Sequence, residues 1–188
     1  MPPKVRIPKE DILATGLQLL RKKGPGAVNA RSIAAGLGCS TQPIFSNYAT
    51  MEQLQADLLA EAYRLYDRRI QTAMTSGQYP PYKAAGMEYI RFAREEKELF
   101  RLLFMRDRTG EPPQEEDSQT MQIIRIIMEQ GKMSEQAARR FHGEMWIFVH
   151  GIATMMATGY LQPEEETVSA MLTDIYQGQL RYRKEEQE

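Results

Sequence analysis

The chain has 188 residues, 42% hydrophobic and 26% charged, which is ordinary for a globular protein of one large or two small domains. Positive charge lies at the start: residues 1–50 have seven Lys/Arg and two acids (+5), leaving 17 basic and 23 acidic groups (−6) for the other 138. The single cysteine, Cys39, excludes an internal disulfide, and two histidines leave little for Ser-His or Cys-His catalysis, so we expect no enzyme.

The first three expected helices follow one another closely near the N-terminus. A helix over 8–23 ends at Gly24-Pro25-Gly26, and Asn29 is a suitable N-cap for a second helix. Gly38 suits the left-handed residue that ends this second helix, and Ser40 can cap the third, which holds Pro43 in its first turn. The spacing of these residues predicts a helix-turn-helix, a motif whose second helix lies in the DNA major groove.

Residues 8–54, about a quarter of the chain, resemble the DNA-binding domain of the TetR family of bacterial transcription regulators. The matching residues are Ile12, Leu17, Leu20, Gly24, Asn29, Arg31, Ile33, Ala34, Leu37, Gly38, Ser40, Ile44, Phe45, Tyr48, Glu52 and Leu54. The resemblance implies a homodimeric regulator, most often a repressor, that binds near-palindromic double-stranded operator DNA and a small-molecule effector.

Two departures from the family pattern concern DNA contacts. Met51 stands where the family usually has a phosphate-binding lysine, and Phe45 and Asn47 replace the usual Tyr and His or Tyr. No Lys or Arg occurs between 37 and 62. Phosphate contacts are therefore expected from backbone N–H groups at helix starts and from four basic side chains, Lys4, Arg6, Lys9 and Arg31.

The resemblance places eight side chains at the operator: Arg31, Ser40, Thr41, Gln42, Pro43, Phe45, Asn47 and Tyr48. Gln and Asn side chains can pair with adenine, whereas Pro and Phe can pack against a thymine methyl group. An alternative for Phe45 is packing inside the three-helix core. Ile44 and Tyr48, four residues apart, favour that core more than the DNA.

Helical periodicity continues to the end of the chain. Further helices are expected over 50–76, 82–96, 99–105, 118–130, 134–158 and 164–183, which gives an all-α fold of about nine helices. We expect a DNA-binding domain at 1–49 and a regulatory and dimerisation domain at 50–188, with the helix 50–76 as connector. The helices 134–158 and 164–183 are expected to form the homodimer interface.

The helix 134–158 carries His142, Trp146 and His150 on one face. No Cys or carboxylate has ligand spacing to them, so neither a metal nor another cofactor is expected. Trp146 followed by His150-Gly151 resembles one group of TetR regulatory domains, although ordinary core packing is the alternative. The expected walls of a mostly apolar effector pocket are Tyr63, Tyr66, Tyr89, Phe92, Phe104, Met105, Trp146 and His150.

The sequence also predicts where the protein is located and leaves two alternative functions open. The start MPPKVRIPKE has no apolar secretory segment, and the run 145–161 is too short and polar to span a bilayer, so we expect a cytoplasmic protein without membrane contact. One rival is an activator, or a regulator controlled by a partner protein. Another is a helical enzyme or ligand carrier with a vestigial DNA-binding head.

Overall fold

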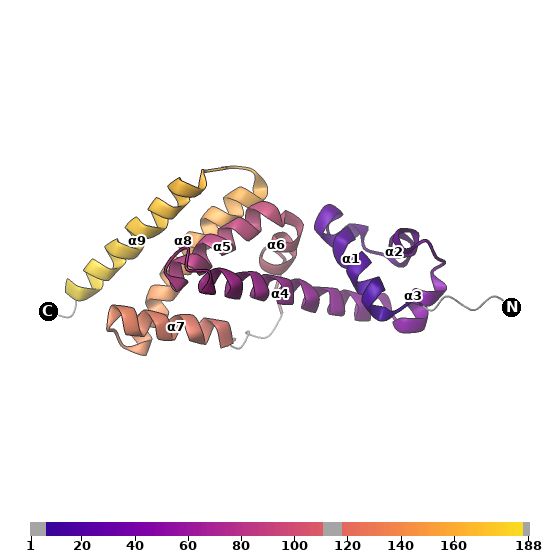
Figure 1. Cartoon of the computed structure of the whole chain (residues 1–188), viewed down its shortest axis with the longest axis horizontal. Coiled ribbons are helices and arrows are strands. Elements are labelled where there is room, and N and C mark those ends of the chain that lie inside the picture. The colour runs from indigo at the N-terminus through magenta and orange to yellow at the C-terminus, as the bar shows by residue number, and fades with distance from the viewer. Residues whose placement is uncertain (1–6, 111–117, 186–188) are drawn as a thin grey trace. The chain divides into compact units, whose positions relative to one another are not determined.

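The computed structural model of the chain describes residues 7–110 and 118–185, with side chains to residue 183 (Figure 1). All regular structure in these ranges is helical, so the expected all-α class of nine α-helices is confirmed there. The helices are α1 (Lys9–Lys23), η1 (Pro25–Ala27), α2 (Ala30–Leu37), α3 (Gln42–Asn47), α4 (Met51–Thr75), α5 (Pro81–Glu95), α6 (Lys97–Phe104), α7 (Ser118–Gly131), α8 (Glu135–Thr158) and α9 (Glu165–Glu185).

Local capping explains where α2 begins and ends. The Asn29 side chain accepts from the Ser32 backbone N–H at 3.0 Å, and the Ser32 hydroxyl accepts from the Asn29 N–H at 3.1 Å. This reciprocal pair satisfies two N–H groups that the first helical turn leaves without partners. Gly38 ends the helix in the left-handed conformation, at φ 65° and ψ 32°, as expected for this turn.

The start of α3 differs from the expectation. Ser40 does not cap this helix, because α3 begins at Gln42 and its N-cap is Thr41, whose side chain makes no capping hydrogen bond. Thr41 has helical backbone angles, φ −72° and ψ −14°, rather than the extended angles that aim a cap side chain at the helix. Pro43 does fall in the first turn, where its missing N–H costs nothing.

The described residues form two compact units by their contacts. The first contains the described part of Met1–Arg68 together with Glu96–Arg106, so α6 belongs with α1, α2 and α3. Its core is formed by fully buried apolar side chains: Ile12, Ile33, Ile44, Leu54, Leu99, Phe100 and Leu103. Buried Glu96 forms an ion pair with Arg21 and ties the residue before α6 to the last turn of α1.

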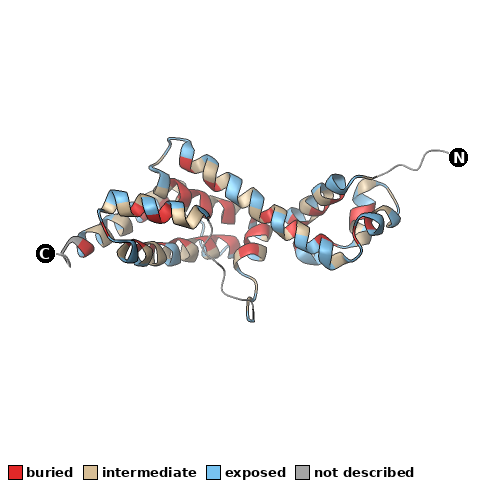
Figure 2. Cartoon of the chain, turned by 90° about the horizontal axis from the view of Figure 1, so that it is seen from below, coloured by how far each residue is buried: buried red, intermediate tan, exposed pale blue. Residues whose placement is uncertain are grey.

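The second unit contains Arg69–Glu95 and the described part of Asp107–Glu188. In this unit α5 is the central helix, because it contacts α7, α8 and α9 and buries eight of its own residues. Tyr82 and Tyr89 of α5 meet His142 and His150 of α8 in the same order along the chain, so α5 and α8 run parallel. Figure 2 shows the buried side of these helices in red and their exposed side in pale blue.

Residues 1–49 and 50–188 remain the predicted functional domains. The contact units have different boundaries from these domains, since α4 contributes residues 51–68 to the first unit and 69–75 to the second. In the parts of the chain that the structure describes, no helix is both long and apolar enough to cross a bilayer.

Candidate nucleic-acid interface and regulatory body

Four of the eight side chains expected at the DNA lie on α3: Gln42, Pro43, Phe45 and Asn47. Phe45 is 51% exposed, so it does not pack in the three-helix core, and Gln42 is exposed one turn before it. Ile44 and Tyr48 are buried at 0% and 3% exposure, which confirms the expected core pair. Of the remaining candidates, Arg31, Ser40 and Asn47 are exposed, and Thr41 and Pro43 are half-buried.

Tyr48 is the one DNA candidate whose side chain the structure buries. Its ring lies under the Lys9 ammonium, which is 4.7 Å from the ring centroid. Lys9 in turn forms a 2.6 Å ion pair with Asp57 and lowers the pKa of that carboxyl group. Tyr48 therefore joins α1, α3 and α4, and we do not retain it as a base or phosphate contact.

Asn47 is exposed, but its amide nitrogen is occupied. It donates to the backbone carbonyl of Pro43 at 2.8 Å and to that of Ile7 at 3.2 Å. Both neighbours are acceptors, so only the nitrogen of the amide fits there. A bidentate pair with adenine needs an N–H donor beside the oxygen, and both N–H groups of Asn47 are used. Gln42 remains as the candidate for adenine recognition.

In the second unit, the structure brings three of the expected effector residues together. The Tyr89 hydroxyl lies 2.8 Å from His150 Nδ1, and the Trp146 ring stacks on the His150 ring at 5.0 Å between centroids and 13° between planes. Burial lowers the pKa of His150 and raises that of Tyr89. Phe92 is fully buried, whereas Trp146 is 45% exposed. The cluster thus runs from the core of α5 to the surface of α8.

The other four effector candidates belong to the first unit. Tyr66 and Phe104 meet edge to face at 5.0 Å between ring centroids, and the Tyr63 hydroxyl lies 3.5 Å from the Leu103 carbonyl oxygen. Met105, just after α6, is 38% exposed. Each group is thus assembled inside its own unit, with Tyr63 and Tyr66 on α4 and Phe104 on α6.

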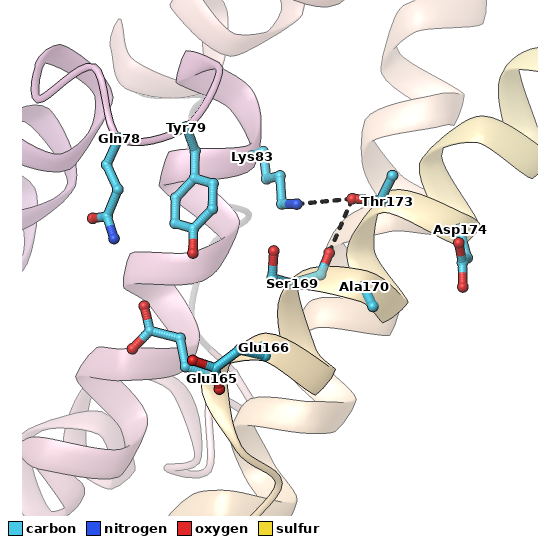
Figure 3. A pocket seen from close by; sticks show the side chains of 9 residues that line it. All are labelled: Gln78, Tyr79, Lys83, Glu165, Glu166, Ser169, Ala170, Thr173 and Asp174. Carbon is cyan, nitrogen blue, oxygen red and sulfur yellow. Dashed lines mark hydrogen bonds between the residues drawn. The ribbon is translucent and has the colours of Figure 1, made fainter.

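A groove of about 510 Å³ in the second unit was not foreseen from the sequence (Figure 3). It lies between α9 and the start of α5 and is lined by Gln78, Tyr79, Lys83, Glu165, Glu166, Ser169, Ala170, Thr173 and Asp174. Lys83 donates to the Thr173 hydroxyl at 2.8 Å, and its ammonium lies over the Tyr79 ring. Eight of the nine lining residues have polar or charged side chains, so the groove differs from the mostly apolar pocket expected for an effector.

Metal ligands are not grouped in the described parts of the chain, where no three His, Cys, Asp or Glu side chains are placed to hold an ion. Each histidine instead faces a tyrosine hydroxyl, His142 at 3.2 Å from Tyr82 and His150 at 2.8 Å from Tyr89. The separation of the histidines along α8, eight residues, places them beside different turns of α5.

The second unit also decides the family. A family model described as the tetracyclin repressor-like C-terminal domain matches residues 82–175, half of the chain. The chain belongs to the TetR family of regulators. The matched residues begin in α5 and end in α9, and they do not overlap the helix-turn-helix at 8–54, so two separate parts of the chain support the same family. No curated protein matches the chain.

Membership of the TetR family confirms the expected regulator. Members of this family are generally not enzymes, and the helical body around α5 and α8 is the part that the family model matches. The finer grouping by Trp146 and His150-Gly151 stays a prediction. The structure adds that Trp146 and His150 are in direct contact, which their spacing of four residues on one helix allows.

Proposed function

We propose that the chain is a cytoplasmic, homodimeric repressor that binds near-palindromic operator DNA through α2 and α3 and is released by a small, mostly apolar molecule. The observation that supports operator binding is the exposure of the Phe45 side chain. In a family regulator, a phenylalanine that is 51% exposed on the second helix of a helix-turn-helix is available to a thymine methyl group.

The exposed residues can make three kinds of contact with DNA. Gln42 presents an amide that can donate to and accept from adenine, and Pro43 and Phe45 present apolar surface. Arg31 on α2 presents a positive charge to a phosphate. Since α3 carries no charged side chain, base recognition rests on shape and hydrogen bonds, and α3 itself adds no cation to the salt dependence.

Two substitutions test this division. Arg31→Gln is expected to weaken binding on every DNA sequence and to lower the slope of log K against log salt by about 1 per monomer. Gln42→Ala is expected to cost about 1–3 kcal/mol per half-site at one base pair and to leave the salt slope unchanged. Both effects are measured by fluorescence anisotropy on DNA from the gene's own upstream region, at several salt concentrations.

The control is Arg125→Gln, which removes an exposed arginine of α7 in the second unit. It should leave both the affinity and the salt slope as in the wild type. Unchanged operator affinity in both Arg31→Gln and Gln42→Ala would refute DNA binding through α2 and α3.

The outward faces of α8 and α9 support dimerisation. Ile147 of α8 is 67% exposed and has Gly143 and Gly151 one turn to either side, where an added Cβ would have open space within 4 Å among the described residues. On α9, Met171 and Tyr182 are 43% and 56% exposed. Large apolar side chains on the open faces of two adjacent helices favour a second copy of the same surfaces, in a four-helix arrangement.

Effector release needs a coupling between the ligand and the operator. We place the ligand at the aromatic side chains around Tyr89, Trp146 and His150, because they combine apolar walls with a polar group. The continuous helix α4 supplies residues to both units and is the covalent route for the coupling. A dimer reads half-sites about 34–36 Å apart, so a small change in the separation of the two α3 helices impairs docking.

The effector is sought with apolar and cationic compounds in a thermal-shift screen, and each hit is then titrated against the protein–operator complex. A true effector should weaken operator binding by roughly 5- to 150-fold, and operator DNA should weaken the compound by the same factor. Trp146→Ala should reduce both effects, whereas Tyr160→Ala, at a 78% exposed residue after α8, should reduce neither. Hits that raise the melting temperature but leave operator affinity unchanged would refute regulation of operator binding by those compounds.

A further inference from the structure

The groove between the start of α5 and α9 has the size of a small-molecule site and a lining unlike that of the aromatic side chains around Trp146 (Figure 3). Its volume of about 510 Å³ lies within the range of roughly 300–1,000 Å³ that is usual for such sites. All of its lining belongs to the second unit and shares no residue with the proposed effector site. A ligand of different chemistry can therefore bind here.

The cations beside the groove are held by contacts within the chain. Lys83 reaches from α5 to α9, where its ammonium donates to the Thr173 hydroxyl at 2.8 Å, and it lies 5.1 Å from the Tyr79 ring centroid. Arg91 of α5 donates to Glu165 at 2.6 Å and so balances one carboxylate of the lining. Two cations thus face three carboxylates, and the groove keeps a surplus of negative charge.

The remaining polar groups of the lining keep their hydrogen-bonding capacity. Among the described residues, no hydrogen bond or ion pair engages the Tyr79 hydroxyl or the side chains of Gln78, Glu166, Ser169 and Asp174. Figure 3 shows the Tyr79 hydroxyl pointing from the segment before α5 toward the first turns of α9, where Glu166 and Ser169 lie. A carboxylate and two hydroxyl groups from separate segments therefore border the same space.

The helix dipole explains part of this arrangement. Glu165 and Glu166 stand in the first turn of α9, where negative charge stabilises a helix. The dipole does not account for the hydroxyl of Tyr79, which comes from another segment and faces the same space. The two explanations differ in what they predict for ligand binding, and a substitution of Glu166 separates them.

The groove also stays open in the proposed dimer. Successive residues of an α-helix are turned by about 100°, so Thr173 projects from α9 about 160° away from Met171 and about 180° away from Tyr182. Met171 and Tyr182 are the exposed apolar side chains of α9 that we assign to the dimer interface. The groove and this interface therefore occupy opposite sides of the helix.

We propose that the groove binds a small molecule that carries a primary ammonium group and several hydroxyl groups, such as an amino sugar. The Glu166 carboxylate accepts from the ammonium group, and the Tyr79 and Ser169 hydroxyls bond to the hydroxyl groups of the ligand. The contact of Lys83 with Thr173 joins the two walls of the site. This inference goes beyond the proposed repressor function and does not depend on operator binding.

The ammonium group should provide most of the selectivity. A hydrogen bond between charged groups is about twice as strong as one between neutral groups, although the exposure of Glu166 reduces its contribution. We therefore expect Glu166→Gln to weaken binding roughly tenfold. Tyr79→Phe removes only a neutral hydroxyl and keeps the ring beside Lys83, so it should weaken binding roughly threefold.

The test compares two disaccharides that share one ring frame, cellobiose and the glucosamine disaccharide that corresponds to it. Cellobiose has hydroxyl groups where the glucosamine disaccharide has amines, and the pH is chosen so that these amines are protonated. Binding to the full-length chain is measured by isothermal titration calorimetry at low salt, and circular dichroism shows that each variant is folded. We expect the glucosamine disaccharide to bind at least about tenfold more tightly than cellobiose.

Glu164→Gln is the matched control for Glu166→Gln. Glu164 is exposed, directly precedes α9 and lies outside the lining, so its substitution removes the same charge close to the groove. It should leave the affinity for the glucosamine disaccharide nearly unchanged. Equal losses in the two variants would show unspecific attraction of a cation to this end of α9 and would overturn the inference.

Two further results would also overturn it. The first is a wild-type chain that binds neither disaccharide, or binds both equally well. The second is a Glu166→Gln variant that melts at a lower temperature but binds the glucosamine disaccharide as the wild type does, since Glu166 would then serve only the helix dipole. Because operator DNA is absent from these measurements, their failure leaves the proposed repressor function unaffected.

Discussion

Replacing Ile147 by lysine is expected to convert the proposed dimer into a folded monomer. Ile147 is 67% exposed in the single chain, so a lysine there costs little while the chain is alone. In a closed interface between two copies of α8, the same ammonium would be buried without a partner, at a cost of several kcal/mol per chain. The dimer should therefore dissociate at least 100-fold more readily, as measured by sedimentation velocity from micromolar concentrations upward.

Leu161→Lys is the matched control for this experiment. Leu161 is also a large apolar residue, 51% exposed, but it lies in the connection between α8 and α9 rather than on either helix. The sequence suggests Ile152 or Ile175 as sites for the same substitution, but both are half-buried in the single chain. A lysine at Ile147 separates association from folding more cleanly. Dimerisation through α8 and α9 is refuted if the wild type is monomeric, or if Ile147→Lys associates as the wild type does.

The local elements of the fold were predictable because their causes are close in the sequence. Asn29 with Ser32, and Gly38 at its positive φ, determine α2 through contacts within ten residues. The start of α3 was harder, since Ser40 and Thr41 are both good N-cap residues and neither makes a capping hydrogen bond in the structure. A six-residue helix also has too few turns for periodicity to show that Phe45 faces outward.

What the sequence could not predict depends on contacts between distant residues. The ion pair of Arg21 with Glu96 joins residues 75 apart and places α6 beside α1. The position of Asn47 in the helix-turn-helix predicts a contact with a base. Its neighbour Ile7 lies 40 residues earlier, outside any helical repeat. The pairs of Tyr82 with His142 and Tyr89 with His150 likewise depend on the parallel packing of α5 and α8.

A charge network around Glu88 is another feature of this kind. Glu88 of α5 is 5% exposed, and each of its carboxylate oxygens meets a different arginine. Arg69 of α4 donates to Oε1 at 2.5 Å, and Arg91 donates to Oε2 at 3.2 Å. The two arginines also bond to Glu95 at 2.7 Å and to Glu165 of α9 at 2.6 Å. The network thus joins the last turns of α4 to α5 and α9 within the second unit.

Neutralising Glu88 is expected to destabilise this unit strongly. Glu88→Gln preserves the volume of the side chain but leaves the guanidinium groups of Arg69 and Arg91 with an amide in place of their shared carboxylate. Breaking a buried ion pair costs about 3–5 kcal/mol, and the lower end applies because both arginines keep about a quarter of their exposure. For a chain of this length, about 3 kcal/mol lowers the melting temperature by roughly 6–12 °C.

Glu95→Gln provides the comparison, because it removes the other carboxylate that binds Arg69. The Glu95 side chain is 45% exposed, so water replaces the lost contact and the cost should stay below about 1 kcal/mol. Both variants replace a carboxylate by an amide. The difference between their melting temperatures, measured by circular dichroism, therefore reports the effect of burial. Equal melting temperatures would show that the Glu88 carboxylate adds no more than a surface ion pair. A large difference would show that α4 is held at its C-terminal end by a buried charge, which the proposed coupling through α4 requires.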